Sequence, residues 1–301
     1  MNRTPSRAPS LTKRAFLGAA ALLVALPVFF LAWKNTRSYL RFTFALKREL
    51  AKHLDATQVH GFKMFLNPRD KVITPHIMSY GQWESLETSL VVKRLKRGDV
   101  FVDGGANVGY YTLLAAHLVG DKGRVYAFEP EPESFKILQK NVLLNGLKNV
   151  VLEQKALGSK KGKLKLYVNT VNRGDHRLHL FKGEKKAYVL VDVVRLDEYL
   201  RGKRVDLVKI DVQGAEGAVI EGMKNLFDVN PRMKIVMEFS PGSLRNFGTD
   251  PLRLYTFLQS KNYSFYDIDV KMDRITRTDL PALYRRYGKD GKWETNLFLD
   301  R

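Results

Sequence analysis

The sequence contains no cysteine among its 301 residues. Disulfide bonds, thiolate zinc sites and iron–sulfur clusters are therefore excluded. Catalysis through a thiolate is excluded as well, and with it the cysteine-dependent methylation of pyrimidine C5. The sequence also lacks long low-complexity tracts and repeats at solenoid periods. With 45% hydrophobic residues, the chain has enough apolar side chains for a sizeable core.

Acidic residues are scarce compared with basic ones. There are 31 Asp and Glu against 51 Lys and Arg, which gives a formal net charge of +20. Residues 1–60 alone hold ten Lys or Arg and only two acidic residues. A basic surface favours anionic partners, which include phospholipid headgroups, nucleic acids and acidic substrates. The charge alone does not choose among them.

Residues 16–33 form a run of eighteen residues without a charge. This is near the lower limit for a helix that spans the hydrocarbon core. A cleaved signal peptide and a peripheral helix are the alternatives, but bulky residues follow Pro27 where cleavage would need small ones. We therefore predict that residues 1–33 are a tail and a retained transmembrane anchor, which binds membrane lipid through residues 16–33.

Residues 34–84 are predicted to hold a juxtamembrane helix, over 34–60, and a small β-rich lead-in, over 61–77. Six basic residues closely follow the apolar run and four precede it, so the positive-inside rule favours a single-pass protein with a cytoplasmic catalytic domain. Aromatic residues and leucines alternate with charges over 34–60. Both a solvated linker helix and a helix that lies on the lipid surface remain open.

Residues 85–301 are predicted to form an α/β domain. Apolar residues at helical spacing predict a helix over 83–96, and strands then alternate with helices, which predicts a mostly parallel sheet covered on both faces. The strands 163–168 and 188–194 are expected to form an inserted hairpin, and 264–270 and 296–299, with no helix between them, an antiparallel edge. The remaining expected strands are 99–103, 124–128, 150–153, 206–210 and 234–239, and the remaining helices 108–119, 133–144, 215–226 and 251–259.

The segment from Asp103 to Gly109 (DGGANVG) follows a hydrophobic strand and opens a helix. Small residues let the backbone turn tightly and approach a ligand, at which the helix N-terminus points its free N–H groups. A dinucleotide loop would need glycine at Ala106. A carboxylate at Asp103 would repel a pyrophosphate but would suit a ligand with an ammonium group.

Glu129 ends the second strand of the alternation, 26 residues after Asp103. An acidic residue at this place accepts hydrogen bonds from both hydroxyls of a ribose. A solvent-exposed acid at a helix start is the alternative, and Glu131 or Glu133 would fill that role equally well. Together with the glycine turn, Glu129 and Asp103 look like the cofactor site of class I methyltransferases, which have a Rossmann-like sheet.

Three further segments resemble the FkbM family of methyltransferases: 191–200 (VDVVRLDEYL), 205–223 (VDLVKIDVQGAEGAVIEGM) and 235–241 (IVMEFSP). The resemblance covers roughly residues 85–270. It implies binding of S-adenosylmethionine and methyl transfer, usually to a hydroxyl of a sugar or another natural-product scaffold. It also implies that the adenine lies near Ala156 and the ribose near Glu129, and that the methionine part meets Asp103, Gly104, Gly105, Ala106, Asn107 and Gly109.

Asp211 lies at a strand end that faces the same crevice, so it is a candidate to take the proton of an acceptor hydroxyl, to orient that hydroxyl or to hold a metal ion. Many relatives carry an acid in place of Gln213, and its absence weakens the metal reading. We predict no metal site. Glu216 either acts in the site or complements its helix dipole.

His176 and His179 lie in a polar loop, over 172–179, that is expected to fold over the acceptor. A histidine there would take a proton near neutral pH. Glu238 ends the next strand and is the third candidate beside Asp211 and His176 for a catalytic role.

The acceptor is predicted to be a small molecule, a glycan or a lipid-linked molecule. A nucleic-acid methyltransferase is the first alternative, prompted by the basic charge. Amino-directed enzymes of that kind carry prolines where residues 211–214 have none, and no aromatic basic stripe is present for stacking single strands. A non-catalytic membrane-anchored scaffold of the same fold is the second alternative.

Overall fold

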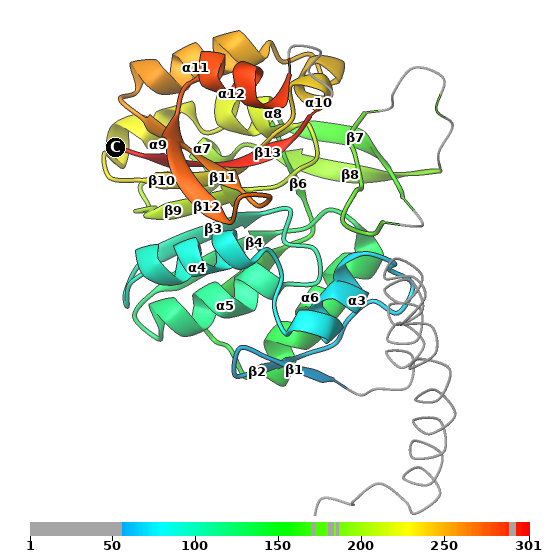
Figure 1. Ribbon diagram of the computed structural model, residues 1–301. Coiled ribbons are helices and arrows are strands. Elements are labelled where there is room, and N and C mark those ends of the chain that lie inside the picture. Colours follow the sequence, from blue (N-terminus) through cyan, green and yellow to red (C-terminus); the bar gives the residue numbers. More distant parts are fainter. Residues whose placement is uncertain (1–55, 170–171, 180–183, 185–186, 289–292) are drawn as a thin grey trace, which may run out of the picture.

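The computed structural model describes residues 56–169, 172–179, 184, 187–288 and 293–301 (Figure 1). The predicted anchor over 16–33 and most of the predicted helix over 34–60 lie outside these residues. In the described part of the chain, no helix is long and apolar enough to cross a membrane.

The core of the fold is an eight-stranded sheet with the strand order β12-β11-β13-β10-β9-β3-β4-β5. Five neighbouring strands are parallel, which confirms the predicted mostly parallel sheet. They are β3 (Val100–Gly104), β4 (Arg124–Phe128), β5 (Val150–Glu153), β9 (Leu207–Ile210) and β10 (Lys234–Phe239).

The antiparallel part of the sheet differs from the prediction. Strand β13 (Thr295–Asp300) lies inside the sheet, antiparallel to both β10 and β11 (Ser264–Asp269). The edge is β12 (Arg274–Thr278), which pairs with β11, and helix α12 (Leu280–Tyr287) follows it. We predicted neither element, because charged residues interrupt the short apolar pattern of this segment.

Helices cover both faces of the sheet, as predicted. Successive strand residues point to opposite faces, so Phe101 packs in one apolar cluster and Val102 in the other. The first cluster includes residues of α4 (Ser85–Arg94), α5 (Tyr110–Val119) and α6 (Pro132–Leu144). The second includes residues of α7 (Leu196–Tyr199), α8 (Glu216–Glu221), α9 (Lys224–Val229), α10 (Pro241–Asn246), α11 (Pro251–Ser260) and α12.

The predicted single helix over 215–226 is wrong, because α8 and α9 are separate. The helix is interrupted at Gly222, where an added Cβ would lie 2.0 Å from the carbonyl oxygen of Gly158. The Gly222 carbonyl also accepts a hydrogen bond from the backbone N–H of Asp197, at 3.0 Å. Gly222 was the local signal for this helix end, and the close approach of Gly158 explains why a glycine is needed there.

The lead-in contains the hairpin β1 (Thr57–Val59) and β2 (Phe62–Met64), and then helix α3 (Ile73–Tyr80). The prediction of β structure over 61–77 is wrong for residues 73–77, which belong to α3. Pro75 does not prevent this helix, because it lies in the first turn, where proline is tolerated. Residues 57–59 form a strand, so the predicted helix over 34–60 does not extend through them. Phe62 and Met64 are buried in the same apolar cluster as α5 and α6, which makes the lead-in part of the same core.

A second, three-stranded sheet contains β6 (Ala156–Leu157), β7 (Gly162–Tyr167) and β8 (Tyr188–Val194), in the order β6-β8-β7. Strands β7 and β8 are antiparallel, which confirms the predicted inserted hairpin. The described residues 172–179 belong to the connection between them, and Arg173 contacts Asn107, in the loop after β3.

Candidate active site

The order of strands reverses between β3 and β9. The chain adds β4 and β5 on one side of β3, and then continues through β9 and β10 on the other side. Ligands of such sheets bind outside the carboxyl ends of the strands at this switch point. Asp103 and Gly104 end β3, and Asp211 follows β9, so the two sequence motifs meet at this point.

The glycine loop after β3 depends on backbone conformations that side chains rarely adopt. Gly105 has φ +87°, and an added Cβ would lie 1.9 Å from the carbonyl oxygen of Asp211. Gly109 has φ +96°, and its Cβ would lie 2.5 Å from Leu138 Cδ1 on α6. Alanine is accepted at Ala106, where the N–H donates to the Phe128 carbonyl at 3.0 Å.

Asp103 is buried at the end of β3, and its Oδ2 accepts a hydrogen bond from the Thr112 hydroxyl at 2.6 Å. Burial raises the pKa of Asp103 to about 6, although the Thr112 bond and the charge of Lys209 act in the opposite direction. A ligand ammonium beside this carboxylate would favour its charged form. The environment of Asp103 therefore fits the methionine end of S-adenosylmethionine.

Glu129 joins the end of β4 to the glycine loop. Its Oε2 accepts the N–H of Asn107 and its Oε1 the N–H of Glu131, each at 2.8 Å. Burial raises the pKa of Glu129 to about 8, against the effect of these two bonds. Each carboxylate oxygen keeps a second lone pair for a hydroxyl donor. Glu129 and the buried Ala156, the residues predicted to lie near the ribose and the adenine, line one small cavity.

Residues 172–179 were expected to fold over the acceptor, but they also contact the glycine loop. The Asn107 side-chain amide donates to the carbonyl of Arg173 at 3.1 Å. His176 Nδ1 accepts the N–H of Asn169 at 3.0 Å, and burial lowers the pKa of His176. Its buried Nε2 has no hydrogen-bond partner among the described residues. His176 lines the small cavity with Glu129, the residue predicted to bind the ribose, and not the large cavity.

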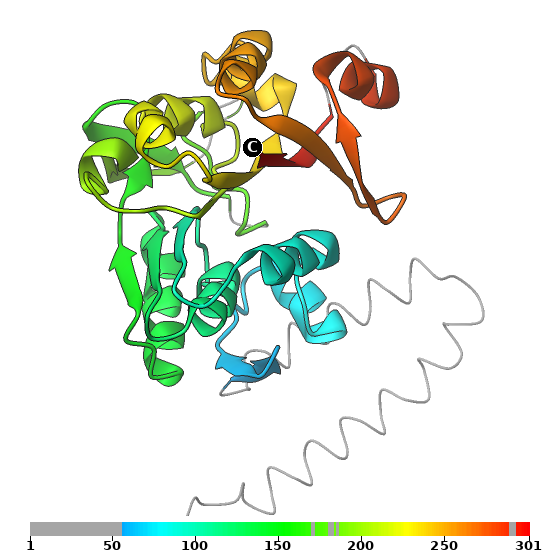
Figure 2. The same cartoon turned by 90° about the vertical axis from the view of Figure 1, so that its left-hand side faces the viewer.

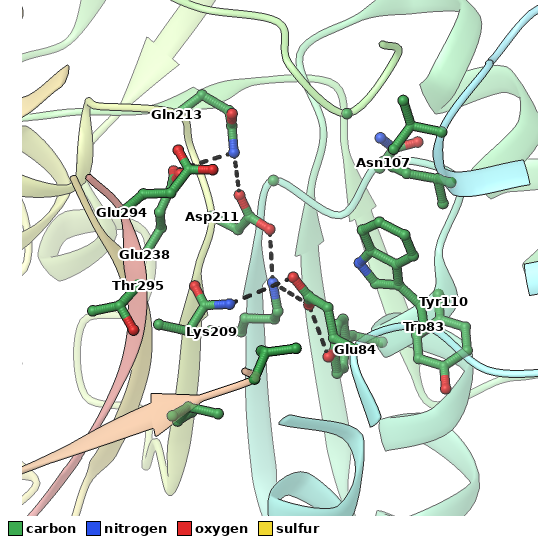
Figure 3. A pocket seen from close by; sticks show the side chains of 18 of the residues that line it. Trp83, Glu84, Asn107, Tyr110, Lys209, Asp211, Gln213, Glu238, Glu294 and Thr295 are labelled. Carbon is green, nitrogen blue, oxygen red and sulfur yellow. Dashed lines mark hydrogen bonds and ion pairs between the residues drawn. The ribbon is translucent and has the colours of Figure 1, made fainter. Parts of the chain in front are cut away.

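Lys209 on β9 is buried among acidic groups (Figure 3). Its Nζ lies 2.9 Å from Asp211 Oδ2 and 3.8 Å from Glu84 Oε2. Burial would lower the pKa of Lys209, but the charges of Asp211 and Glu84 outweigh it and raise the pKa. Burial likewise acts against the charged form of Asp211, but Lys209 outweighs it and holds the pKa of Asp211 below its usual range. Asp211 is therefore a fixed anion.

Lys209 and Glu84 are functional candidates that the sequence analysis missed. Glu84 accepts a hydrogen bond from the Tyr111 hydroxyl at 3.0 Å, and burial raises its pKa to about 7. A charged residue inside the apolar strand 207–210 was the available signal for Lys209, because a buried lysine requires a partner.

Gln213 connects the two carboxylates that we predicted to be catalytic. Its Nε2 donates to Asp211 Oδ1 at 2.7 Å and to Glu238 Oε2 at 3.1 Å. The pKa of Glu238 lies well above its usual range, because Glu238 is buried and lies near Glu216 and Asp211. Figure 3 shows Gln213, Asp211, Glu238 and Lys209 facing the same pocket.

Glu216 holds the turn that presents Gln213. Its carboxylate accepts the N–H of Gly214 at 2.9 Å and the N–H of Val212 at 3.1 Å. Burial raises the pKa of Glu216 to about 7. These contacts shape the loop beneath the site, which differs from both roles that the sequence left open for Glu216.

A cavity of about 790 Å³ opens beside the glycine loop, and a smaller one of about 50 Å³ lies next to it. Gly105, Asn107, Asp211 and Gln213 line both cavities. In the part of the chain that the structure describes, no group of three His, Cys, Asp or Glu is arranged to hold a metal ion. The large cavity is lined further by Trp83, Glu84, Asp103, Tyr110, Lys209, Glu238, Tyr287, Trp293, Glu294, Thr295 and Asn296, among others.

Comparison with known proteins shows the family of this chain. The profile of the methyltransferase FkbM domain matches residues 103–265, more than half of the chain. A methyltransferase of Beauveria bassiana is 31% identical over 143 residues, which are 40% of this chain and 57% of that protein. Methyltransferase sdnD of Sordaria araneosa is 29% identical over 191 residues, 51% of this chain and 71% of that protein.

A third relative is the hexuronic acid methyltransferase AglP of Haloferax volcanii, 26% identical over 140 residues. These residues are 45% of this chain and 54% of that protein, so the chain matches little more than half the length of two of these three relatives. Among solved structures, the methyltransferase FkbM of Methylobacillus flagellatus has 13% sequence identity and a TM-score of 0.42, over 84% of this chain and 57% of that chain.

Proposed function

Because this chain belongs to the methyltransferase FkbM family, we propose that it transfers a methyl group from S-adenosylmethionine to a hydroxyl group of a sugar, a glycan or a lipid-linked acceptor. S-adenosylmethionine is the cofactor of this class I domain, and its sulfonium supplies an activated methyl group. The name of the Haloferax relative refers to a sugar acid, which supports a sugar hydroxyl as the acceptor.

The position of Asp211 and Gln213 carries the proposal. Both residues line the small cavity, which holds Glu129 and Ala156, and the large cavity, which holds Glu238. A cofactor that extends from Glu129 in the small cavity to Asp103 in the large one would meet an acceptor in the large cavity beside these two residues. Methyl transfer by direct displacement depends mainly on such alignment, which is worth roughly 7–11 kcal/mol in favourable cases.

Glu238 is the better candidate for the general base. Asp211 is held as an anion by Lys209, and its low pKa makes it a weak base. Glu238 has a raised pKa, and the amide of Gln213 fixes the position of its carboxylate. Once ionised, Glu238 is the stronger base and takes the hydroxyl proton as the new C–O bond forms, while Asp211 orients the hydroxyl.

The charge of the large cavity favours an uncharged acceptor. Glu84, Glu238 and Glu294 line it, and the charge of the buried Lys209 is already shared with Asp211. A carboxylate or phosphate deep in this cavity would meet the charge of the Asp211 anion and would oppose the ionisation of Glu238. Neutral sugar hydroxyls find hydrogen-bond acceptors in the same side chains, with Trp83 and Trp293 beside them for the sugar face.

The test uses S-adenosylmethionine with a labelled methyl group and a panel of neutral glycans, uronic-acid glycans, lipid-linked sugars and RNA. Mass spectrometry locates the methyl group in each product. We expect a methyl ether on neutral or lipid-linked sugars, and a loss in kcat of roughly 10²–10⁴ for Glu238→Gln if it is the general base. Glu221→Gln, with a half-exposed side chain outside the site, is the control. Methylation of RNA alone would overturn the proposal.

A further inference from the structure

The mouth of the large cavity is formed by two segments that are far apart in the sequence. Residues 71–73 lead into α3, which begins at Ile73, and residues 270–274 include the turn between β11 and β12. Val72 and Val270 both line the cavity. Figure 2 shows the β11–β12 hairpin extending over the side of the molecule where α3 and α4 lie. We call residues 71–73 and 270–274 the cavity mouth.

Apolar side chains of the cavity mouth are turned to solvent. Val270 is 66% exposed, Met272 65% and Val72 40%. The turn that carries Met272 is held in place, because its N–H donates to Asp269 Oδ1 at 3.2 Å. These exposed apolar groups contribute nothing to the core, and their grouping beside a cavity indicates a contact surface.

The same mouth carries basic residues. Lys71, Lys271 and Arg274 are exposed there, with Asp273 as the one exposed acid between them. Glu84, Glu238 and Glu294 line the interior of the cavity, so a ligand that suits the interior does not account for this basic rim. Cations beside exposed apolar side chains match a surface with anionic headgroups over hydrocarbon.

An aromatic side chain extends this surface outward along α3. Tyr80 is 57% exposed, and the centroid of its ring lies 4.7 Å from the centroid of the His76 ring. His76 in turn lies 5.1 Å from Trp83, which lines the cavity. Tyrosine and tryptophan favour the boundary between headgroups and hydrocarbon.

We infer that the cavity mouth docks on an anionic lipid bilayer, with Val72, Val270 and Met272 at the headgroup boundary and the three basic residues against lipid phosphates. This docking is carried by described residues and is independent of the predicted anchor over 16–33. It opens the large cavity toward the bilayer, so the acceptor enters from the membrane surface; this last step rests on the proposed function.

The absence of cysteine allows a direct test in the full chain. Met272→Cys is labelled with an environment-sensitive fluorophore and added to vesicles of phosphatidylcholine alone or mixed with phosphatidylglycerol, both with a spin-labelled lipid as quencher. Leu143→Cys, on α6 and 83% exposed, is the matched control. Val270→Cys replaces Met272→Cys if that variant does not fold.

We expect a blue shift and quenching at residue 272 in the anionic vesicles, and neither at residue 143. Reversing Lys71 or Lys271 to Glu is expected to weaken binding at residue 272 by roughly fivefold or more for each basic residue lost. Absence of quenching at residue 272, or equal quenching at both sites, overturns the inference.

A blue shift at residue 272 that needs no lipid and grows with protein concentration would assign the surface to a second copy of the chain and also overturn the inference. The quenching does not depend on methyl transfer. Quenching without transfer to any acceptor would therefore reject the proposed function and keep the docking, and transfer without quenching would do the reverse.

Discussion

Replacing Lys209 by Met would leave buried carboxylates without their cation. The Lys209 side chain is 7% exposed, and its Nζ lies 2.9 Å from Asp211 and 3.8 Å from Glu84. Removing one partner of a buried ion pair costs about 3–5 kcal/mol, because the remaining charge is not compensated. Met has a similar length and leaves no large cavity, so we expect the free energy of unfolding to fall by that amount.

Denaturant unfolding of the variant at several pH values measures this loss. Without Lys209, the pKa of Asp211 in the folded variant would rise above its unfolded value near 3.9. The folded variant would then bind more protons than the unfolded chain, so the loss should be largest at neutral pH and shrink below about pH 5. Adding Asp211→Leu should recover much of the stability.

Lys224→Met is the control, since Lys224 makes a half-exposed ion pair with Glu221. Such a pair contributes about 0–1 kcal/mol. If Lys209→Met costs no more than Lys224→Met, or if its loss is the same well below pH 5 as at pH 7, the reasoning about Lys209 and its two carboxylates is wrong.

Three further predictions concern the cofactor side. Gly105→Ala should abolish cofactor binding, because the added Cβ would clash with the Asp211 carbonyl oxygen. Gly146→Ala is the control and should bind the cofactor normally, since Gly146 also has a positive φ but no atom near the added Cβ. Equal binding by the two variants would contradict the prediction. Binding of S-adenosylmethionine at pH 7 should release protons, because its hydrogen-bond donors and its ammonium group lower the raised pKa values of Asp103 and Glu129. Calorimetry in buffers of different ionisation enthalpy measures this release, and proton uptake would refute the prediction. His176→Phe should weaken cofactor affinity without moving the pH dependence of kcat, and a shifted pH profile would assign His176 to proton transfer after all.

The sequence predicted the parallel half of the fold well. Strands β3, β4, β5, β9 and β10 carry dense runs of β-branched and aromatic residues, and helices separate them, so the pattern has few alternatives. The positions of the glycine loop, Asp103 and Glu129 followed, because strand ends next to a switch point meet at one edge of the sheet.

The antiparallel end of the sheet was not predictable in the same way. Strand β12 is short and charged, so it carries no clear alternation. Helix α12 has signals that were overlooked: the Asp279 side chain accepts the N–H of Ala282 at 2.7 Å, and Pro281 lies in the first turn. The position of β13 inside the sheet depends on long-range pairing, which no local pattern encodes.

The acceptor side of the site was predicted only in part. Asp211 and Glu238 were named, but Lys209, Glu84 and the bridge by Gln213 determine how these two carboxylates differ. Lys209 and Gln213 each contact Asp211 from two positions away, but Glu84 and Glu238 reach this group from distant parts of the chain. No local pattern in a single sequence indicates these two long-range contacts.

Calorimetric titration with S-adenosylmethionine and its demethylated product tests the central claim most directly. The purified chain is titrated beside Asp103→Ala and Glu129→Ala, with circular dichroism to confirm that each variant is folded. The account predicts saturable binding of both ligands to the chain and loss of binding in both variants. No binding by the folded chain, or full binding by the folded variants, would contradict the assignment of the cofactor site at the ends of β3 and β4.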